Sequence, residues 1–220
     1  MAEQRKKDKK RVAVAGSAGN PISLAHQEFA EILTKSRLFD LVLWFPSGTR
    51  SDKPDLISSG HRVRMTELAF NEEWQKKQPT EFCIDLREAH RPSIPTIGIL
   101  REVQKEYSDA EIVFATGIDV LAPRPEYGGG CDVLRYWVEG ESLMRDWTFA
   151  VLPREGYPDP KELQKEGKLP IHFLLLPRPS SSIAGISSTE VRRRVKAGES
   201  FDGLVHPEVA EYIKKHELYR

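Results

Sequence analysis

The sequence predicts an α/β protein with a Rossmann-like parallel sheet flanked by helices and a small helical part at the C-terminal end. Six short apolar runs alternate along the chain with segments in which apolar residues recur at helical spacing. The runs at residues 12–15 and 41–45 are apolar throughout, which is typical of strands buried on both faces of a parallel sheet. The first run leads through small residues into a helix start, whose free N–H groups attract anions. In such folds ligands bind at the carboxyl ends of the strands.

The composition favours a small polar ligand. The 220 residues include 33 basic and 33 acidic side chains. This balance argues against nucleic acid or a membrane surface as the main partner. No run approaches the roughly 18 apolar residues of a spanning helix, and the N-terminus lacks the apolar core of a signal peptide. We therefore expect a cytoplasmic protein.

The two cysteines, Cys83 and Cys131, lie far apart and without CxxC spacing. A disulfide framework or a zinc site is therefore not expected, and we assign no residue to a metal site. We expect both thiols to be reduced, with Cys83 buried in a strand.

Residues 1–10 differ from the rest of the chain because they include five basic residues and almost no apolar ones. We expect a disordered basic tail here, followed by a single domain over residues 11–220. A nuclear-import or anion-binding role for the tail stays open.

The first strand is expected at residues 12–15. Gly16 follows, and its missing side chain allows a sharp turn and a close approach of the backbone to a ligand. Asn20 is expected to cap the first helix, with Pro21 at its first position, where the missing N–H costs nothing. His26 lies on the apolar face of this helix, either as a core histidine or as a contact for a bound anion.

The second strand, residues 41–45, ends in a turn-forming Pro-Ser-Gly-Thr cluster that leads to Lys53. A lysine just past the carboxyl end of a strand can hold a phosphate, although an exposed lysine is the simpler interpretation. A helix is expected near residues 60–67 and a further strand at residues 81–85. Thr96 opens the next helix, and helix capping explains it as well as a ligand contact does.

The fourth strand, residues 111–116, runs directly into Gly-Ile-Asp, which ends at Asp119. An aspartate at the end of a strand is an ordinary helix cap. Residues 128–130 are three glycines, which indicates either a lid or a flexible loop. Trp137 follows at helical spacing, where core packing would explain it.

Two more strands are expected at residues 148–152 and 172–176. Residues 159–169 between them contain helix-forming charged side chains, and we interpret them as a solvated connector. We detect no internal repeat.

The second strong signal is the stretch Ile-Ser-Ser-Thr-Glu-Val-Arg, residues 186–192. Ser187 and Glu190 have the spacing of a capping box, and Gly198 stands where a helix stop belongs. Three hydroxyls, the free N–H groups of a helix start and Arg192 form a site fit for a di- or triphosphate. A plain capped helix with a basic surface is the alternative.

Residues 16–26 resemble the signature GGxFxPxHxGH of the nucleotidyltransferase superfamily, with Ser23 at a position where the signature has His or Thr. Three further positions depart from it: Ser17, Gly19 and Ala25. Residues 186–192 match the family element ISSTxxR at every specified residue. Residues 205–220 resemble the VPxxVxxYIxxxxLY ending of bacterial-type nicotinate-nucleotide adenylyltransferases.

This resemblance covers roughly residues 11–220 and implies an enzyme of NAD biosynthesis from the nicotinate/nicotinamide-nucleotide adenylyltransferase family. Such an enzyme joins ATP to nicotinate or nicotinamide mononucleotide and releases the dinucleotide and pyrophosphate. Mg²⁺ is implied with ATP, and no covalent intermediate is required. Catalysis would come from positioning and from neutralising charge on the phosphates.

The resemblance also assigns roles to residues. The catalytic charge carriers would be His26 and Arg192. Contacts to ATP and its phosphates would come from Gly16, Ser17, Ser23, Asp119, Ser187, Ser188 and Thr189, with Asp119 beside the ribose. Contacts to the pyridine mononucleotide would come from Lys53, Thr96 and Trp137.

Two alternatives stay open. The departures in the first motif allow a non-catalytic nucleotide-binding or scaffold protein of the same fold. Another transferase of the superfamily, such as a pantetheine-phosphate adenylyltransferase or an enzyme that uses CTP, is disfavoured by the ISSTxxR element and the YIxxxxLY ending. The residues do not decide between nicotinate and nicotinamide mononucleotide, nor between a monomer and a homo-oligomer.

Overall fold

The computed structural model describes residues 9–50, 53–180, 183 and 185–220. Its centre is a six-stranded sheet in the order β3-β2-β1-β4-β5-β6, in which every neighbouring pair is parallel. The strands are β1 (Arg11–Ser17), β2 (Leu41–Pro46), β3 (Glu81–Ile84), β4 (Glu111–Gly117), β5 (Thr148–Leu152) and β6 (His172–Leu175). The Rossmann-like parallel sheet predicted from the apolar runs is thereby confirmed.

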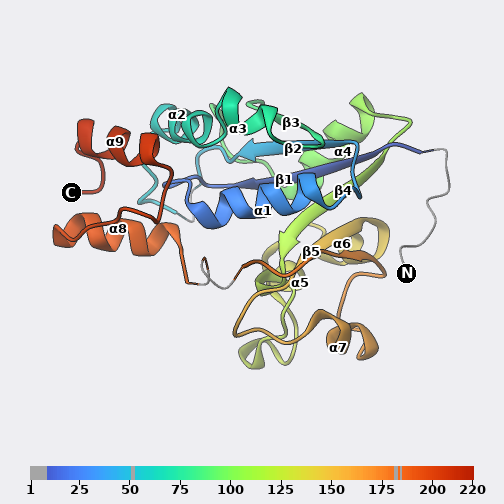
Figure 1. The fold of residues 1–220 in the computed structure, drawn as a ribbon. Coiled ribbons are helices and arrows are strands. Elements are labelled where there is room, and N and C mark those ends of the chain that lie inside the picture. The colour runs from blue at the N-terminus through green and yellow to red at the C-terminus, as the bar shows by residue number, and fades with distance from the viewer. Residues whose placement is uncertain (1–8, 51–52, 181–182, 184) are drawn as a thin grey trace.

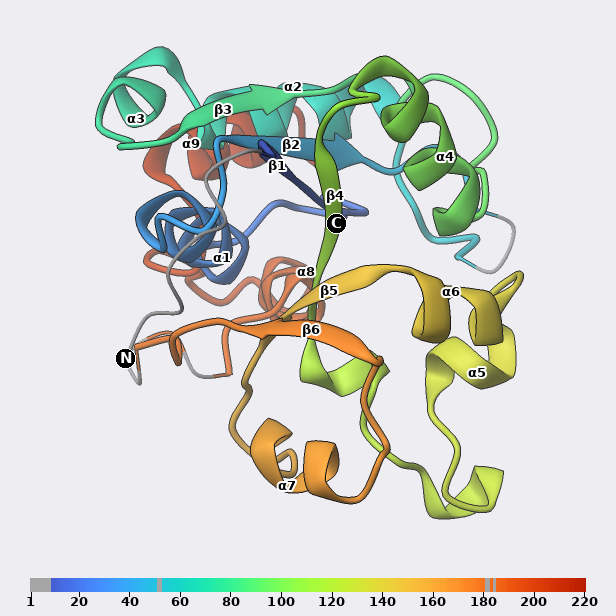
Figure 2. The ribbon, with the colours of Figure 1, turned by 90° about the vertical axis from the view of Figure 1, so that its right-hand side faces the viewer.

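Helices cover both faces of this sheet (Figure 2). One face carries α1 (Leu24–Lys35), α2 (Ser59–Ala69), α8 (Ser188–Ala197) and α9 (Pro207–Lys215). The other carries α4 (Thr96–Glu106), α5 (Asp132–Tyr136), α6 (Gly140–Asp146) and α7 (Pro160–Lys165). The remaining elements are α3 (Glu72–Lys76) and the 3₁₀ turns η1 (Ile118–Val120) and η2 (Pro125–Tyr127).

The strand β1 explains why the runs are apolar throughout. Its alternate residues Ala13 and Ala15 belong to the core beneath α1 and α8, whereas Val12 and Val14 belong to the core beneath α4 and α5. Because successive side chains of a strand point to opposite faces, a sheet that is covered on both sides needs apolar residues at every position.

The small C-terminal helical part consists of α8 and α9, which lie together at one end of the molecule, with the C-terminus between them (Figure 1). Helix α9 packs against α2 and buries Val209 and Ile213. These two side chains lie in the same core as Ala13 and Ala15 of β1. The chain end is therefore anchored to the sheet domain by apolar packing.

The first helix begins later than the sequence pattern suggested. Asn20 and Pro21, joined by a cis peptide bond, lie in the turn before the helix. Ser23 is the N-cap instead, with an extended backbone at φ −117° and ψ 168°. The prediction of Asn20 as cap was wrong because its side chain bonds to the backbone of residues 55 and 57, far away in the sequence.

Cys83 is exposed, contrary to the expectation that a strand would bury it. It lies in β3, which is an edge strand and whose residues alternate between exposed and buried. Cys131 is buried. The connector at residues 159–169 is also less solvated than expected, because Leu163 and Leu169 pack into the core beside α4.

Trp137 ends α5, and a second short helix, α6, follows it.

The expected solvated tail falls mostly on residues 1–8, which lie outside the described part of the chain. In the described ranges, no helix combines the length and apolar character needed to cross a membrane.

Candidate active site

The candidate site lies where the parallel strands end, beside the point at which the strand order reverses between β1 and β4. A Cβ on Gly16 would come within 2.3 Å of the Phe45 carbonyl oxygen, so the close approach of β1 and β2 here requires glycine. The backbone of Gly16 is exposed. The neighbouring Ser17 hydroxyl is buried and has no hydrogen-bond partner among the described residues. The end of β1 thus presents an accessible backbone and an unpaired hydroxyl.

Arg62 of α2 ties the loops at this edge together. Its side chain is almost completely buried, with an exposed fraction of 1%. The guanidinium donates to the carbonyls of Ala18, at 2.8 Å, and Ser47, at 2.7 Å. It also donates to the carbonyls of Gly48 and Ile57, each at 3.2 Å. One buried side chain therefore bonds both to the β1–α1 loop, residues 18–23, and to the two ends of the β2–α2 loop, at residues 47–48 and 57.

Burial lowers the pKa of Arg62, and the opposing effect of Glu88 is smaller. An arginine nevertheless stays protonated, since its ordinary pKa is so high. Glu88 is itself buried and accepts hydrogen bonds from the Ser93 hydroxyl and the Ile94 N–H. The interior beside the loops therefore contains the charged side chain of Arg62, whose hydrogen bonds are accepted by main-chain carbonyls.

His26 is held by the start of its own helix. Its Nδ1 accepts a hydrogen bond from the Ser23 N–H at 3.1 Å and lies 2.8 Å from the Ser23 hydroxyl oxygen. An Nδ1 that accepts leaves the proton of a neutral imidazole on Nε2. The ring also meets Trp44 edge to face, with 6.3 Å between the centroids. His26 is therefore both a packed residue and an oriented Nε2–H donor, so the two interpretations of the sequence are compatible.

Burial lowers the pKa of His26 to about 4, and the positive charge of Arg154 contributes to the same shift. In the ligand-free protein at neutral pH, His26 is therefore uncharged. The ligand-free protein therefore does not carry the positive charge that we expected on His26, and protonation of the ring would require Nδ1 to give up the hydrogen bond from the Ser23 N–H.

The start of α8 docks directly onto the β1–α1 loop. The Ser188 hydroxyl donates to the Pro21 carbonyl at 2.8 Å, and Arg192 Nη1 donates to the Asn20 carbonyl at 2.6 Å. The two stretches singled out in the sequence are separated by more than 160 positions but share one surface. Ser187 is the N-cap, as predicted, and accepts from the Glu190 N–H.

These contacts change the expected phosphate cradle. The Ser187 hydroxyl caps the helix and the Ser188 hydroxyl binds a carbonyl, so both already have structural roles. Thr189 Oγ1 lies 3.4 Å from Arg192 Nη2 and is exposed. The first N–H groups of a helix have no partner within it. Thr189, Arg192 and these N–H groups are therefore the donors best placed to meet an anion.

Asp119 follows β4 and forms an ion pair with Arg154, with 3.1 Å between Oδ1 and Nη1. Gly117 makes room for this carboxylate, because a Cβ there would lie 2.2 Å from Asp119 Oδ1. Since Arg154 also acts on the pKa of His26, these side chains share one electrostatic environment. Arg154 was not among the predicted site residues, although its place two residues past the end of β5 was a signal in the sequence.

The three residues expected to contact the second substrate are more scattered. Lys53 is exposed, in the β2–α2 loop, two residues from the Asp55 carbonyl that Asn20 Nδ2 binds. Thr96 opens α4, on the sheet face opposite α1. Trp137 packs edge to face on Phe114, with 5.7 Å between the ring centroids. Core packing accounts for Trp137 in the ligand-free protein.

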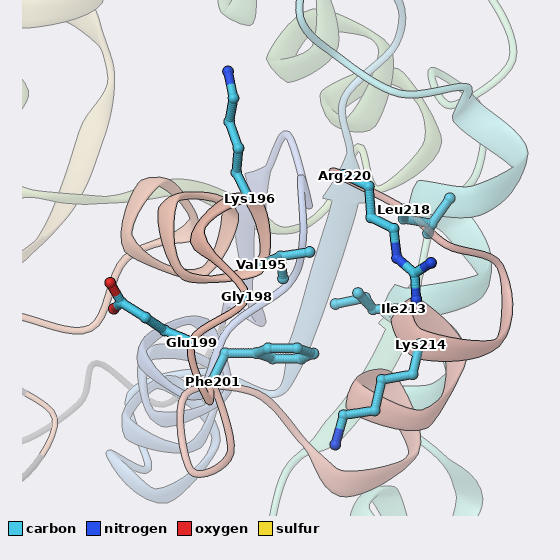
Figure 3. Close-up of a pocket in the computed structure, with 9 residues that line it drawn as sticks. All are labelled: Val195, Lys196, Gly198, Glu199, Phe201, Ile213, Lys214, Leu218 and Arg220. Atoms are coloured by element: carbon cyan, nitrogen blue, oxygen red, sulfur yellow. The ribbon is translucent and has the colours of Figure 1, made fainter.

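A hollow of about 500 Å³ lies at the other end of α8. Figure 3 shows its lining, which includes Lys196, Phe201, Ile213 and Lys214. None of the sequence-predicted site residues belongs to this lining. The hollow is thus a feature of the C-terminal helical part and not of the strand ends.

The chain is similar to known proteins over most of its length. Residues 15–194 match the cytidylyltransferase-like family. The chain is 33% identical to a probable nicotinate-nucleotide adenylyltransferase of Thermus thermophilus, over 96% of this chain and 100% of that protein. A protein of the same name from Synechococcus is 30% identical, over 96% of this chain and 95% of the relative.

Among solved structures, the fold is similar to that of Plasmodium falciparum nicotinic acid mononucleotide adenylyltransferase complexed with NaAD. The TM-score is 0.78 at 22% sequence identity, and the match covers 96% of this chain and 97% of the other.

The lowered pKa of His26 predicts a pH-dependent stability. The unfolded chain takes up a proton near the ordinary pKa of 6.5 and the folded chain only near 4, so the free energy of unfolding should fall as the pH drops through this window. The loss attributable to His26 is about 3 kcal/mol at most. Denaturant unfolding of wild type and His26→Gln between pH 7 and pH 4 measures it, and the variant should show the flatter curve.

The matched control is His172→Gln, since His172 is exposed at the start of β6. This variant should follow the wild-type curve. Parallel curves for wild type and His26→Gln would show that His26 is not the group responsible.

Proposed function

The chain belongs to the cytidylyltransferase-like family and is a nucleotidyltransferase related over its length to nicotinate-nucleotide adenylyltransferases, and from this premise we propose its reaction. It transfers the adenylyl group of ATP to nicotinate mononucleotide, forms nicotinate adenine dinucleotide and releases pyrophosphate. This is a step of NAD biosynthesis. The names of the relatives favour nicotinate over nicotinamide mononucleotide as the acceptor.

The observation that supports this proposal most strongly is the contact between the β1–α1 loop and the start of α8. The bonds from Ser188 to Pro21 and from Arg192 to Asn20 bring a strand–turn–helix edge and a second helix N-terminus together. The start of α8 and Arg192 supply N–H donors and positive charge for a polyphosphate. At the start of α1, the Leu24 N–H already donates to the Leu204 carbonyl at 3.0 Å, so α1 contributes through its preceding loop and His26.

In the proposed reaction, a phosphate oxygen of the mononucleotide attacks the α-phosphorus of ATP. The bond from that phosphorus to the bridging oxygen breaks, and pyrophosphate leaves with the bonding electron pair. No protein nucleophile takes part. The protein contributes alignment of the two phosphates and donors for the charge that develops on the leaving group.

We propose that His26 donates its Nε2–H to a phosphate oxygen as a neutral imidazole, because its Nδ1 is already occupied by the Ser23 N–H. Ser23 holds the ring in this orientation through Nδ1. Arg192 supplies the permanent charge, while Gly16 and Ser17 supply close backbone approach. The start of α8 is formed by Ser187, Ser188 and Thr189. Of these three, Thr189 is proposed to contact a phosphate oxygen directly.

For the nucleoside parts, we propose that Asp119 accepts hydrogen bonds from the ribose hydroxyls of ATP. Arg154 would keep this carboxylate oriented. Lys53 is proposed as a phosphate contact and Thr96 as a contact to the mononucleotide. Trp137 is proposed to stack on the pyridine ring. This would require its side chain either to move away from Phe114 or to use the ring face that does not contact Phe114.

Among the described residues, no group of three or more His, Cys, Asp or Glu side chains is arranged to hold a metal ion. This fits Mg²⁺, which usually keeps several waters and binds through the phosphates of its substrate. We propose that Mg²⁺ enters with ATP and neutralises charge on its phosphates, while Arg192 and the helix N–H groups orient them.

The reaction predicts a simple substrate pattern. Pyrophosphate release should require ATP, Mg²⁺ and nicotinate mononucleotide, and should be weaker with nicotinamide mononucleotide. Assays with pantetheine phosphate as acceptor, and with CTP in place of ATP, test the other transferases of the superfamily. Silence with both pyridine mononucleotides, together with calorimetric binding of ATP, would instead identify a non-catalytic nucleotide-binding protein.

Two arginines of α8 provide a matched test of the phosphate site. Arg192 bonds to the loop at the Asn20 carbonyl, whereas Arg194 pairs with Glu190 of its own helix at 2.7 Å. Arg192→Ala should lower kcat/KM for ATP by about ten- to hundred-fold, since it removes charge-assisted hydrogen bonds. Arg194→Ala should stay within about twofold of wild type. Equal losses in steady-state assays would contradict the assignment of Arg192.

A further inference from the structure

We propose that Tyr219, the penultimate residue, is a positioning residue that holds the β1–α1 loop in its ATP-binding shape. The Tyr219 hydroxyl donates a hydrogen bond to Asn20 Oδ1 at 3.1 Å, across 199 positions of sequence. The chain end would thereby form part of the ATP site without touching the nucleotide. This inference rests on the proposed function and deepens it.

Asn20 is the point at which several segments meet. Its side chain is buried, with an exposed fraction of 4%. Its amide donates to the Asp55 carbonyl at 3.3 Å, and Oδ1 also accepts a long hydrogen bond of 3.4 Å from the Ile57 N–H. Its own carbonyl accepts from Arg192. Tyr219 therefore binds the side chain of Asn20, and Arg192 binds its backbone carbonyl.

The backbone conformation of residues 217–219 accompanies the placement of the Tyr219 side chain against the β1–α1 loop. Tyr219 has φ 68° and Glu217 has φ 50°, both in the left-handed region that non-glycine residues rarely adopt. Such conformations persist only where the surrounding structure determines them. The neighbours of Tyr219 in sequence, Leu218 and Arg220, line the outer hollow (Figure 3), whereas Tyr219 reaches the loop.

The electrostatic surroundings suit a hydrogen-bond donor. Burial raises the pKa of Tyr219, and the nearby positive charges of Arg192 and Arg62 oppose this shift only in part. The phenol therefore stays protonated at neutral pH and keeps its O–H for Asn20. A phenylalanine would retain the ring, which packs against the core beneath α1 and α9, and would remove only this bond.

The test compares Tyr219→Phe with Tyr212→Phe. Tyr212 belongs to the same C-terminal segment, and its hydroxyl lies 2.9 Å from His61 Nδ1, outside the loop contacts. Tyr219→Phe should raise KM for ATP and the Kd for α,β-methylene-ATP about threefold to tenfold, the effect of one neutral hydrogen bond. KM for nicotinate mononucleotide should stay near wild type, and the thermal unfolding midpoint should fall by only a few degrees, because one hydrogen bond is lost. Tyr212→Phe should leave both KM values and the Kd unchanged.

Combination with Asn20→Ala separates positioning from a general structural effect. In the Asn20→Ala background, Tyr219→Phe should produce no further change in the Kd for the analogue, because the partner of the hydroxyl is gone. An independent, multiplicative effect there would overturn the proposal. So would a Tyr219→Phe protein with wild-type values, or one in which the KM values for both substrates rise together.

The binding measurement keeps this proposal distinct from the proposed reaction. If wild type binds the analogue without turning over either pyridine mononucleotide, the reaction fails, and the Kd comparison alone decides the role of Tyr219. If wild type does not bind the analogue, both proposals fail.

Discussion

The buried guanidinium of Arg62 is the interaction on which the candidate site depends. It carries a charge into the interior and satisfies it with four main-chain carbonyls from the loops that follow β1 and β2. A buried charge is costly unless its hydrogen bonds are complete, and loss of the side chain would leave buried carbonyls unpaired. The hydrogen bonds of Arg62 therefore favour the arrangement of the two loops that surrounds it, and this arrangement shapes the edge of the candidate site.

The other features of the site are built on that edge. With the loop fixed at Ala18, Ser23 starts α1 and turns His26 so that its Nε2–H is available. Arg192 can then reach the Asn20 carbonyl, which seats the start of α8 beside the start of α1. The apolar core explains why the helices pack on the sheet, but these polar contacts decide how the loops are held. Both motifs of the family thus contribute to one surface because their backbones are bonded together.

The sequence was most informative where structure depends on local spacing. Continuous apolar runs indicated the strands, and the capping residues around 187 and the stop at Gly198 bounded α8 correctly. It was least informative where tertiary contacts decide. Asparagine is a favourable N-cap residue, but the side chain of Asn20 forms hydrogen bonds with Asp55 and Tyr219, which are distant in sequence. Ser188 stays a predicted phosphate contact, while in the ligand-free protein its hydroxyl donates to the Pro21 carbonyl, a tertiary contact that local spacing does not indicate. The exposure of Cys83 follows from the edge position of β3, which depends on strand order and not on composition.

The central claim is that the β1–α1 loop and the start of α8 form a single polyphosphate site. The most direct test is a crystal structure of the protein with α,β-methylene-ATP and Mg²⁺. We expect the triphosphate between these two helix starts, with His26 Nε2 and the Arg192 guanidinium within hydrogen-bond distance of phosphate oxygens. A nucleotide bound in the hollow beside Phe201, or one that leaves the start of α8 without contact, would contradict it.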